Sequence, residues 1–443
     1  MADDLTLKIQ SSTQYPILEK QTEDINRCFR CGLCKTVCPS FEELKLEGSS
    51  PRGRVQLAQS VLTGSVDFNR AVESRMLDCL NCMRCAEICP SDVRTDRIVL
   101  AARAELAKRG RLDLVKKAAF KTVMRRPAVM NTAARAASYG QRWLYEGNTL
   151  ARELVPQLAG MEDKHFPVLS TRQTLSRWPE INPAEGTRKM RVAYFIGCAT
   201  NLMFTAVADA TIRVLTRNGV EVLIPRRQAC CGIPVYSSGD YETAKKLATM
   251  NLESFSGLDV DAIVTDCSSC SGALKHDIDE LFGAGRFEKP VHDLTEFLVN
   301  TIDMTMNFVP VPVRVTYHDP CHLRRGQGIF REPRSLLNMV PGVEFIEMAD
   351  SDRCCGGAGT FSYTHHDLSR KVGARKVERI RDTEADYVAT PCPSCKMQLD
   401  DLINHEGLSV RTIHPVEIID AAYTGNGIPA TEGGTRTERA VLQ

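Results

Sequence analysis

The sequence predicts an α/β protein in which a helical, cysteine-dense N-terminal domain precedes two copies of a parallel βαβ domain. Three observations support this prediction. One cysteine spacing occurs twice, identically, within the first 90 residues. In the second half of the chain, short apolar runs alternate with helical patterns. Three sequence landmarks in that half recur about 124 residues further on.

The duplication is defined by three pairs of matching segments, separated by 123, 124 and 125 residues. They are Arg191–Cys198 with Arg314–Cys321, Gln228–Gly232 with Asp352–Gly356, and Asp261–Cys270 with Asp386–Cys395. Because the separation varies by only two residues, the segments indicate a duplicated domain rather than chance similarity.

Each copy has the pattern of a parallel sheet. In the first copy we expect strands at 192–196, 220–224 and 262–265, with helices at about 203–217 and 241–256. Ligands of open parallel sheets gather beyond the carboxyl ends of the strands. Five cysteines per copy follow these expected ends: Cys198, Cys230, Cys231, Cys267 and Cys270, and Cys321, Cys354, Cys355, Cys392 and Cys395. We therefore expect five thiols on one rim of each repeat.

Composition narrows the class of protein. The net charge of +1 makes no general case for nucleic-acid binding. The longest apolar stretch, 192–215, is interrupted by Asn201, Asp209 and Arg213, so no membrane-spanning segment is expected. The chain begins Met-Ala-Asp-Asp, which is unlike a secretory signal. We expect a cytoplasmic protein, with peripheral binding to the inner face of the membrane as the alternative. In a reducing compartment, 18 regularly spaced cysteines indicate metal or cluster ligands rather than disulfides.

The first eight cysteines form two identical Cys-x2-Cys-x2-Cys-x3-Cys-Pro motifs. This spacing is typical of bacterial ferredoxins, in which the fourth cysteine of each motif binds the other [4Fe–4S] cluster. The first ferredoxin site is therefore predicted to be Cys28, Cys31, Cys34 and Cys89. The second ferredoxin site is predicted to be Cys79, Cys82, Cys85 and Cys38. Structural zinc, the alternative, usually takes two separated pairs of ligands and fits this run poorly.

The predicted organisation has five parts. A helical ferredoxin-like domain with two [4Fe–4S] clusters and a helical extension covers 20–140, and 141–190 is a linker. The repeats cover 191–305 and 311–423, and 424–443 is a disordered tail. The segment from Arg103 to Arg126 contains nine basic residues and two acidic ones. We interpret them as a solvated helix face, with a surface for anionic lipid or an acidic partner as the alternative.

Each repeat contains two adjacent cysteines followed by glycine: Cys230-Cys231-Gly232 and Cys354-Cys355-Gly356. Adjacent cysteines rarely form a disulfide, because the peptide between them would be strained. They reach one cluster if the chain turns sharply, which a following glycine permits. Five thiols exceed the four that a cubane cluster needs. The pattern indicates a less regular cluster or a redox-active spare thiol.

These repeats resemble the cysteine-rich CCG domains of the heterodisulfide reductase catalytic subunit, which also occur in iron–sulfur subunits of glycolate and lactate oxidases. The resemblance implies a non-cubane [4Fe–4S] cluster in each repeat. A zinc or degenerate site in one repeat, and empty sites, are the alternatives. Over about residues 25–425 the chain is similar to the glycolate oxidase iron–sulfur subunit. The landmarks of this similarity are Ser50–Arg54, His318–His322 and Cys354–Gly359.

One-electron centres cannot take a hydride from a hydroxy acid, so a flavin must first split the two-electron step. The chain has no flavin motif, and we expect a partner subunit to carry FAD. The leading hypothesis is an electron-transfer subunit of a glycolate or lactate dehydrogenase that delivers electrons to a quinone or another carrier. The alternatives are a catalytic heterodisulfide reductase subunit and an electron-conducting subunit of a membrane redox complex. His318 and His322 flank Cys321 and are candidate proton donors, or else ordinary strand-end histidines.

Overall fold

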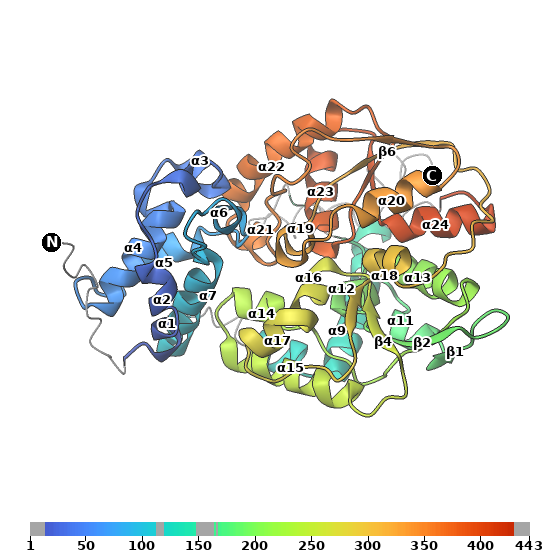
Figure 1. Ribbon diagram of the computed structural model, residues 1–443, viewed down its shortest axis with the longest axis horizontal. Helices are drawn as coiled ribbons and strands as arrows, with labels where there is room; N and C mark the ends of the chain where they lie inside the picture. The colour runs from blue at the N-terminus through green and yellow to red at the C-terminus, as the bar shows by residue number, and fades with distance from the viewer. Residues whose placement is uncertain (1–13, 112–118, 148–163, 165–166, 429–443) are drawn as a thin grey trace. The chain divides into compact units, whose positions relative to one another are not determined.

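The computed structural model describes residues 14–111, 119–147, 164 and 167–428 (Figure 1). The described chain forms two compact units. The first unit contains the chain up to residue 118, together with 233–244 and 356–372. The second unit contains 119–232, 245–355 and the chain from 373 onward. Most of the predicted disordered tail, from residue 429, lies outside the described residues.

Between residues 14 and 111 the first unit is built of helices and turns. Its elements there are α1 (Pro16–Glu19), α2 (Thr22–Asn26), η1 (Leu33–Lys35), α3 (Pro39–Leu44), η2 (Glu47–Ser49), α4 (Pro51–Leu62), α5 (Arg70–Leu77), α6 (Arg84–Glu87), α7 (Thr95–Leu106) and η3 (Ala107–Arg111). Leu18, Met76, Ile98 and Val99 are fully buried at the centre of its core. α4 buries apolar residues at three- and four-residue intervals, whereas α7 is buried on nearly all sides, and the two helices pack against each other.

The second unit contains two sheets whose parallel strands follow the same order, and the first sheet has β1 as an additional edge strand. The first sheet comprises β1 (Ile181–Asn182), β2 (Met190–Tyr194), β3 (Val220–Leu223), β4 (Ala262–Thr265) and β5 (Val291–Asp293), in the order β1-β3-β2-β4-β5. The second sheet comprises β6 (Val313–Tyr317), β7 (Val343–Ile346), β8 (Tyr387–Ala389) and β9 (Arg411–Ile413), in the order β7-β6-β8-β9. β2 to β5 are parallel, as are β6 to β9. The predicted mixed α/β class with parallel sheets is confirmed.

Helices connect these strands, as parallel pairing requires. The expected helices at 203–217 and 241–256 are α13 (Thr205–Arg217) and α15 (Tyr241–Phe255). The other elements that lie wholly or partly in this unit are η4 (Ala119–Met124), α9 (Pro127–Gly147), α11 (Thr174–Arg177), α12 (Cys198–Leu202), α16 (Ser268–Gly272), η5 (Ala273–Asp277), α17 (Ile278–Glu280), α18 (Leu294–Asn300), α19 (Cys321–Gln327), α20 (Glu332–Met339), α22 (His366–Arg381), α23 (Pro393–His405) and α24 (Pro415–Thr424). α14 (Ile233–Ser237) and α21 (Phe361–Thr364) belong to the first unit.

The segment 141–190, which is predicted to be a linker, contains α11 and β1. β1 within it pairs antiparallel with β3, so that Ile181 lies opposite Leu223 and Asn182 opposite Val222. The Asn182 side chain also donates to the Val222 carbonyl at 3.2 Å. A two-residue strand is too short to produce a periodic sequence pattern, and β1 is extended because it pairs with β3 at the edge of the sheet.

The two sheets share one hydrophobic core. Its buried residues include Val192 and Ile212 from the first repeat and Val315 and Ile418 from the second. α13 and α24 lie side by side across this boundary (Figure 1). Polar contacts fix their register: Arg213 pairs with Asp420, whose Oδ1 lies 3.0 Å from Nε of the arginine. The two repeats are therefore one packed body rather than two domains on a flexible connection.

Candidate cluster sites

The two ferredoxin motifs have the same backbone conformation. Arg30 and Gly32 have φ of 60° and 86°, and Asn81 and Met83, at the matching places 51 residues later, have φ of 53° and 60°. Such left-handed residues are unusual outside glycine. Alternating them with other conformations turns successive N–H groups toward one concave side, which favours anions and sulfide clusters. The backbone of both motifs therefore fits a [4Fe–4S] cluster.

Thiols of the two motifs meet as the ferredoxin spacing requires. Burial raises the pKa of Cys85 well above its ordinary value, and the neighbouring thiolates of Cys82, Cys79 and Cys38 add to the shift. Cys38 thus lies close to the three cysteines of the other motif, although it belongs to the first motif in sequence. A cluster must displace these protons on binding. The described contacts do not bring Cys89 to the first site, and its ligand role stays a prediction.

The first ferredoxin site is the more open of the two. Cys31 is exposed, and Cys28 and Cys34 are partly buried. Burial raises the pKa of Cys34 to about 11, while the Arg52 N–H opposes this shift and the Cys28 thiol adds to it. In the second site, by contrast, Cys38 and Cys82 are buried.

In the first repeat the five cysteines gather at the carboxyl ends of the strands. Cys198 begins α12, just after β2, and its Sγ lies 3.7 Å from Sγ of Cys230. Further thiol contacts join Cys230 to Cys231, Cys231 to Cys270 and Cys270 to Cys267. Gly232, directly after the paired cysteines, has φ of 95°, which permits the sharp turn that brings both thiols to one side.

The second repeat has the same arrangement. Cys321 begins α19 after β6, and Cys392 immediately precedes α23. Thiol contacts join Cys354 to Cys355, Cys355 to Cys395 and Cys395 to Cys392. A β-carbon at Gly356 would lie 2.3 Å from the Ser369 carbonyl oxygen, so this position must be glycine.

The two sets of thiols are joined to each other. Cys267 of the first repeat contacts Cys392 of the second. The loops that carry them are hydrogen-bonded, since N–H and Oγ of Ser268 donate to the Pro391 carbonyl at 2.9 and 2.7 Å. Ser269 Oγ lies 3.6 Å from Sγ of Cys392. Sequence reasoning placed five thiols on the rim of each repeat, but the two rims meet at Cys267 and Cys392. Seven of the ten cysteines are buried, and Cys198, Cys321 and Cys354 are partly buried.

The two candidate histidines have different surroundings. His318 is 1% exposed, and its ring nitrogen lies within 4.8 Å of the sulfur atoms of Cys355 and Cys395, which are within the same distance of each other. Its Nδ1 has no hydrogen-bond partner within the described residues. In the first repeat, the matching residue is the buried Phe195. His322 is partly buried, and its Nδ1 lies 3.2 Å from Ser269 Oγ.

Sequence reasoning missed His414, which joins the two repeats. Its Nε2–H donates to the Asp266 carbonyl at 2.9 Å, and its Nδ1 accepts from the Val416 N–H at 3.0 Å. These two bonds require the neutral ring, and burial lowers the pKa of His414 to about 4. The only local signal is the helix-capping pattern of His414 with Glu417, which gives no indication of Asp266.

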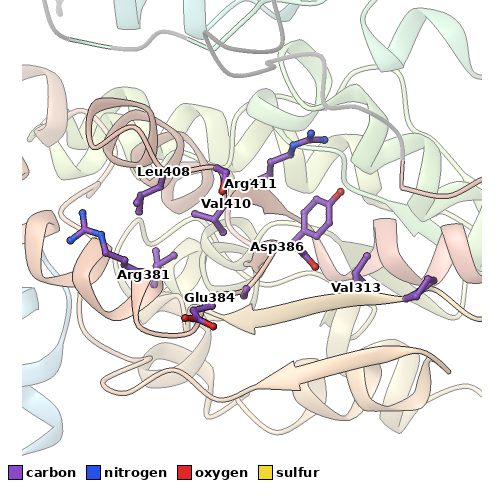
Figure 2. Close-up of a pocket in the computed structure, with 12 residues that line it drawn as sticks. Val313, Arg381, Glu384, Asp386, Leu408, Val410 and Arg411 are labelled. Carbon is purple, nitrogen blue, oxygen red and sulfur yellow. The ribbon is translucent and has the colours of Figure 1, made fainter. Parts of the chain in front are cut away.

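An open cavity of about 620 Å³ lies at the opposite edge of the second sheet (Figure 2). Val313, Tyr387 and Arg411, at the beginnings of β6, β8 and β9, contribute to its lining. No cysteine lines this cavity, so it is separate from the candidate cluster sites. Among the described helices, none is long and apolar enough to cross a membrane.

Comparisons with known proteins agree with this division of the chain. Residues 24–93 match the family model of the 4Fe-4S dicluster domain, and 192–275 and 315–400 match the cysteine-rich CCG domain. The probable glycolate oxidase iron-sulfur subunit of Bacillus subtilis is 32% identical over 435 residues, which cover 94% of this chain and 98% of that protein.

Two further relatives differ in how much of the chain they match. One dihydromethanophenazine:CoB–CoM heterodisulfide reductase subunit, from Methanosarcina acetivorans, is 28% identical, with 86% of this chain and 90% of that protein covered. Lactate utilization protein A of Oceanobacillus iheyensis is 33% identical, with 53% of this chain and 99% of that protein covered.

Proposed function

This chain belongs to the family of glycolate oxidase iron–sulfur subunits, and we propose that it conducts electrons within a flavin-linked 2-hydroxy-acid dehydrogenase. Family membership and the domain matches establish an iron–sulfur electron-transfer subunit. The specific complex is the proposal. Glycolate and lactate are the substrates that we assign to it, because the names of two similar proteins refer to them.

The first eight cysteines are proposed to hold two cubane [4Fe–4S] clusters, which accept and release single electrons when bound. The chain supplies the thiolates and the inward-facing N–H groups of the left-handed turns at Arg30 and Asn81. Cys38 and Cys82 are buried and Cys79 and Cys85 partly buried, so the second ferredoxin site is less accessible to water than the first, where Cys31 is exposed.

The contact between Cys267 and Cys392 is the observation that carries the proposal for the repeats. Two centres that transfer electrons must lie close together, and this contact makes the ligand shells of the two repeats adjoin. We assign the five cysteines of each repeat to one non-cubane [4Fe–4S] cluster. Zinc in one of the repeats is the alternative for the metal content.

A partner subunit is proposed to carry FAD, to oxidise the hydroxy acid, and to pass electrons to this chain one at a time. A quinone or a membrane redox subunit is the proposed acceptor. Anaerobic purification of the native complex tests this assignment. An FAD-containing protein should co-purify, and only the complex should oxidise glycolate or lactate with an artificial dye. Dye reduction by the isolated chain would overturn the proposed division of labour.

A second candidate function, cleavage of a disulfide at the second repeat, is favoured by His318. This residue places a protonatable ring beside Cys355 and Cys395, whereas the first repeat has Phe195 there. Reduction of a disulfide consumes two electrons and two protons and releases two thiols. A buried proton donor beside the sulfur atoms would suit that reaction.

A further inference from the structure

The segment Ser50–Arg54 lies between the two ferredoxin sites, and its backbone geometry is fixed. Ser50 Oγ accepts from the Gly53 N–H at 3.0 Å and caps α4. A β-carbon at Gly53 would lie 1.9 Å from the Glu47 carbonyl oxygen. The chain therefore passes tightly against η2, and the arginines on either side of Gly53 have different environments.

Arg52 faces the first ferredoxin site, where it shares the carboxylate of Glu47 with Lys35, so that this acid offsets one of the two positive charges. Its Nε donates to Glu47 at 2.6 Å, and its Nη1 donates to the Arg30 carbonyl at 3.1 Å. Lys35 contacts the same carboxylate at 2.7 Å. Hydrogen bonds from Arg52 and then Lys35 lower the pKa of Glu47 to about 2, so this acid is ionised. Arg52 is also only partly buried, with 31% of its side chain accessible, and water screens its charge further.

Arg54 faces the second ferredoxin site and is 1% exposed. Its Nε donates to the Arg75 carbonyl at 2.8 Å, and its Nη2 donates to Ser40 Oγ at 2.9 Å. The remaining nitrogen, Nη1, lies 4.0 Å from Sγ of Cys38. Its acceptors are a carbonyl oxygen, a hydroxyl and the thiol of a proposed cluster ligand, and none of them is a carboxylate.

Arg103 lies on the other side of the same site and is 6% exposed. Its guanidinium donates to four carbonyl oxygens: those of Met76 at 2.8 Å, Leu77 at 3.2 Å, Cys79 at 2.6 Å and Ser237 at 2.9 Å. None of these is a carboxylate. The interpretation of Arg103–Arg126 as a solvated face is therefore wrong at its first residue, which is buried beside a cluster ligand.

The acids nearest this site have their own partners. Asp78 pairs with Arg75 at 3.1 Å and also lies near Arg54 and Arg103, so three arginines share this one carboxylate. Asp96, which lies beside Cys85, pairs with Arg94 at 2.8 Å. Arg54 and Arg103 are thus surplus positive charges. An unpaired buried cation is strongly unfavourable. A [4Fe–4S] cluster with four thiolate ligands has a net negative charge. Bound at this site, it would be the counter-ion of the two arginines.

We propose that Arg54 and Arg103 raise the reduction potential of the cluster at the second ferredoxin site above that of the cluster at the first. Reduction adds negative charge to a cluster, so adjacent buried cations favour the reduced form. With clusters bound at both sites, one electron would pass from the reduced cluster held by Cys28, Cys31, Cys34 and Cys89 to the oxidised cluster held by Cys79, Cys82, Cys85 and Cys38. The proposal rests on the ligand sets proposed above.

The test is a redox titration of the full chain, followed by low-temperature electron paramagnetic resonance. Cys31→Ser and Cys82→Ser identify the signals of the first and second sites. In the wild type, the signal that Cys82→Ser removes should titrate at the higher potential. This measurement needs no arginine variant. The reverse order would overturn the proposal.

The arginines are then changed singly, with iron content measured in each variant. Arg54→Gln and Arg103→Gln should each lower the equilibrium constant for reduction of the second cluster about tenfold, which is 59 mV for one electron. Arg54→Lys should restore part of the shift. Arg52→Gln, the matched control in the same segment, should leave the second cluster unchanged. Equal shifts of both clusters, or none in protein with full iron, would overturn the proposal. Absence of the ferredoxin clusters from the wild-type chain would instead overturn the proposed ligand sets.

Discussion

The thiol of Cys267 in the first repeat contacts the thiol of Cys392 in the second, 125 residues further along the chain. Ser268 maintains this contact by donating two hydrogen bonds to Pro391, the residue before Cys392. His414 adds a third connection through the Asp266 carbonyl, directly before Cys267. The duplicated domain is thus arranged so that its two cysteine groups share a boundary, and centres bound there would be neighbours.

Iron content provides the first prediction. The anaerobically purified chain should contain about sixteen irons, four in each of four clusters. Elemental analysis against protein concentration measures this number. A content near eight irons with two zincs would show that the CCG repeats are not iron sites.

Replacing Cys31 by serine should remove one ferredoxin signal from the low-temperature spectrum of the reduced protein. The signals of the CCG repeats should stay, because Cys31 lies in the separate first unit. Cys82→Ser is the matched control and should remove the other ferredoxin signal. A Cys31→Ser spectrum that retained every wild-type signal would show that the ligand assignment is wrong.

Replacing His318 by alanine distinguishes the two candidate functions. A subunit that only conducts electrons needs no proton donor, so hydroxy-acid oxidation by the complex should change by less than about tenfold. A disulfide-cleaving site would lose the ~10²–10⁴-fold that a positioned acid contributes.

The control for His318→Ala is His322→Ala, whose ring contacts Ser269 rather than Cys355 and Cys395. The second assay is reduction of thiol-cofactor heterodisulfides by the chemically reduced chain. We expect no turnover in that assay. Rapid turnover that collapses in His318→Ala but not in His322→Ala would establish the catalytic function.

Acid should weaken the boundary between the repeats through His414. Burial lowers its pKa to about 4 in the folded chain, against about 6.5 for an unperturbed histidine. Below pH 6.5 the unfolded chain therefore binds a proton at this residue that the folded chain does not bind. The free energy of unfolding decreases as the pH is lowered. This residue should remove about 1 kcal/mol of stability between pH 6.5 and 5.5.

The measurement is the free energy of unfolding of the wild type and of His414→Gln at both pH values. The variant lacks a titrating ring at this position, so its stability should fall less over the same interval. An equal fall in the two proteins would show that His414 does not carry the pH dependence.

Patterns within short segments of the sequence were enough to predict most of the local structure. β4 occupies the expected residues 262–265, and α13 begins within two residues of its predicted start. α13 is recognisable from the periodicity of its apolar side chains, and β4 from a continuous run of residues that are all buried. β1 was missed because its structure depends on β3, forty residues away, and not on its own pattern.

The sequence by itself determined the arrangement of eighteen cysteines in two ferredoxin motifs and two CCG repeats, and this arrangement predicts the cluster chemistry. Cysteines of one motif lie within a few residues of one another, so the spacing that a cluster requires can be recognised in the sequence itself. Only the tertiary structure decided that Cys267 meets Cys392, that His318 rather than His322 lies beside the thiols, and that Arg103 is buried. Each of these contacts joins residues far apart in the chain, and the packing of helices and sheets around shared cores brings them together.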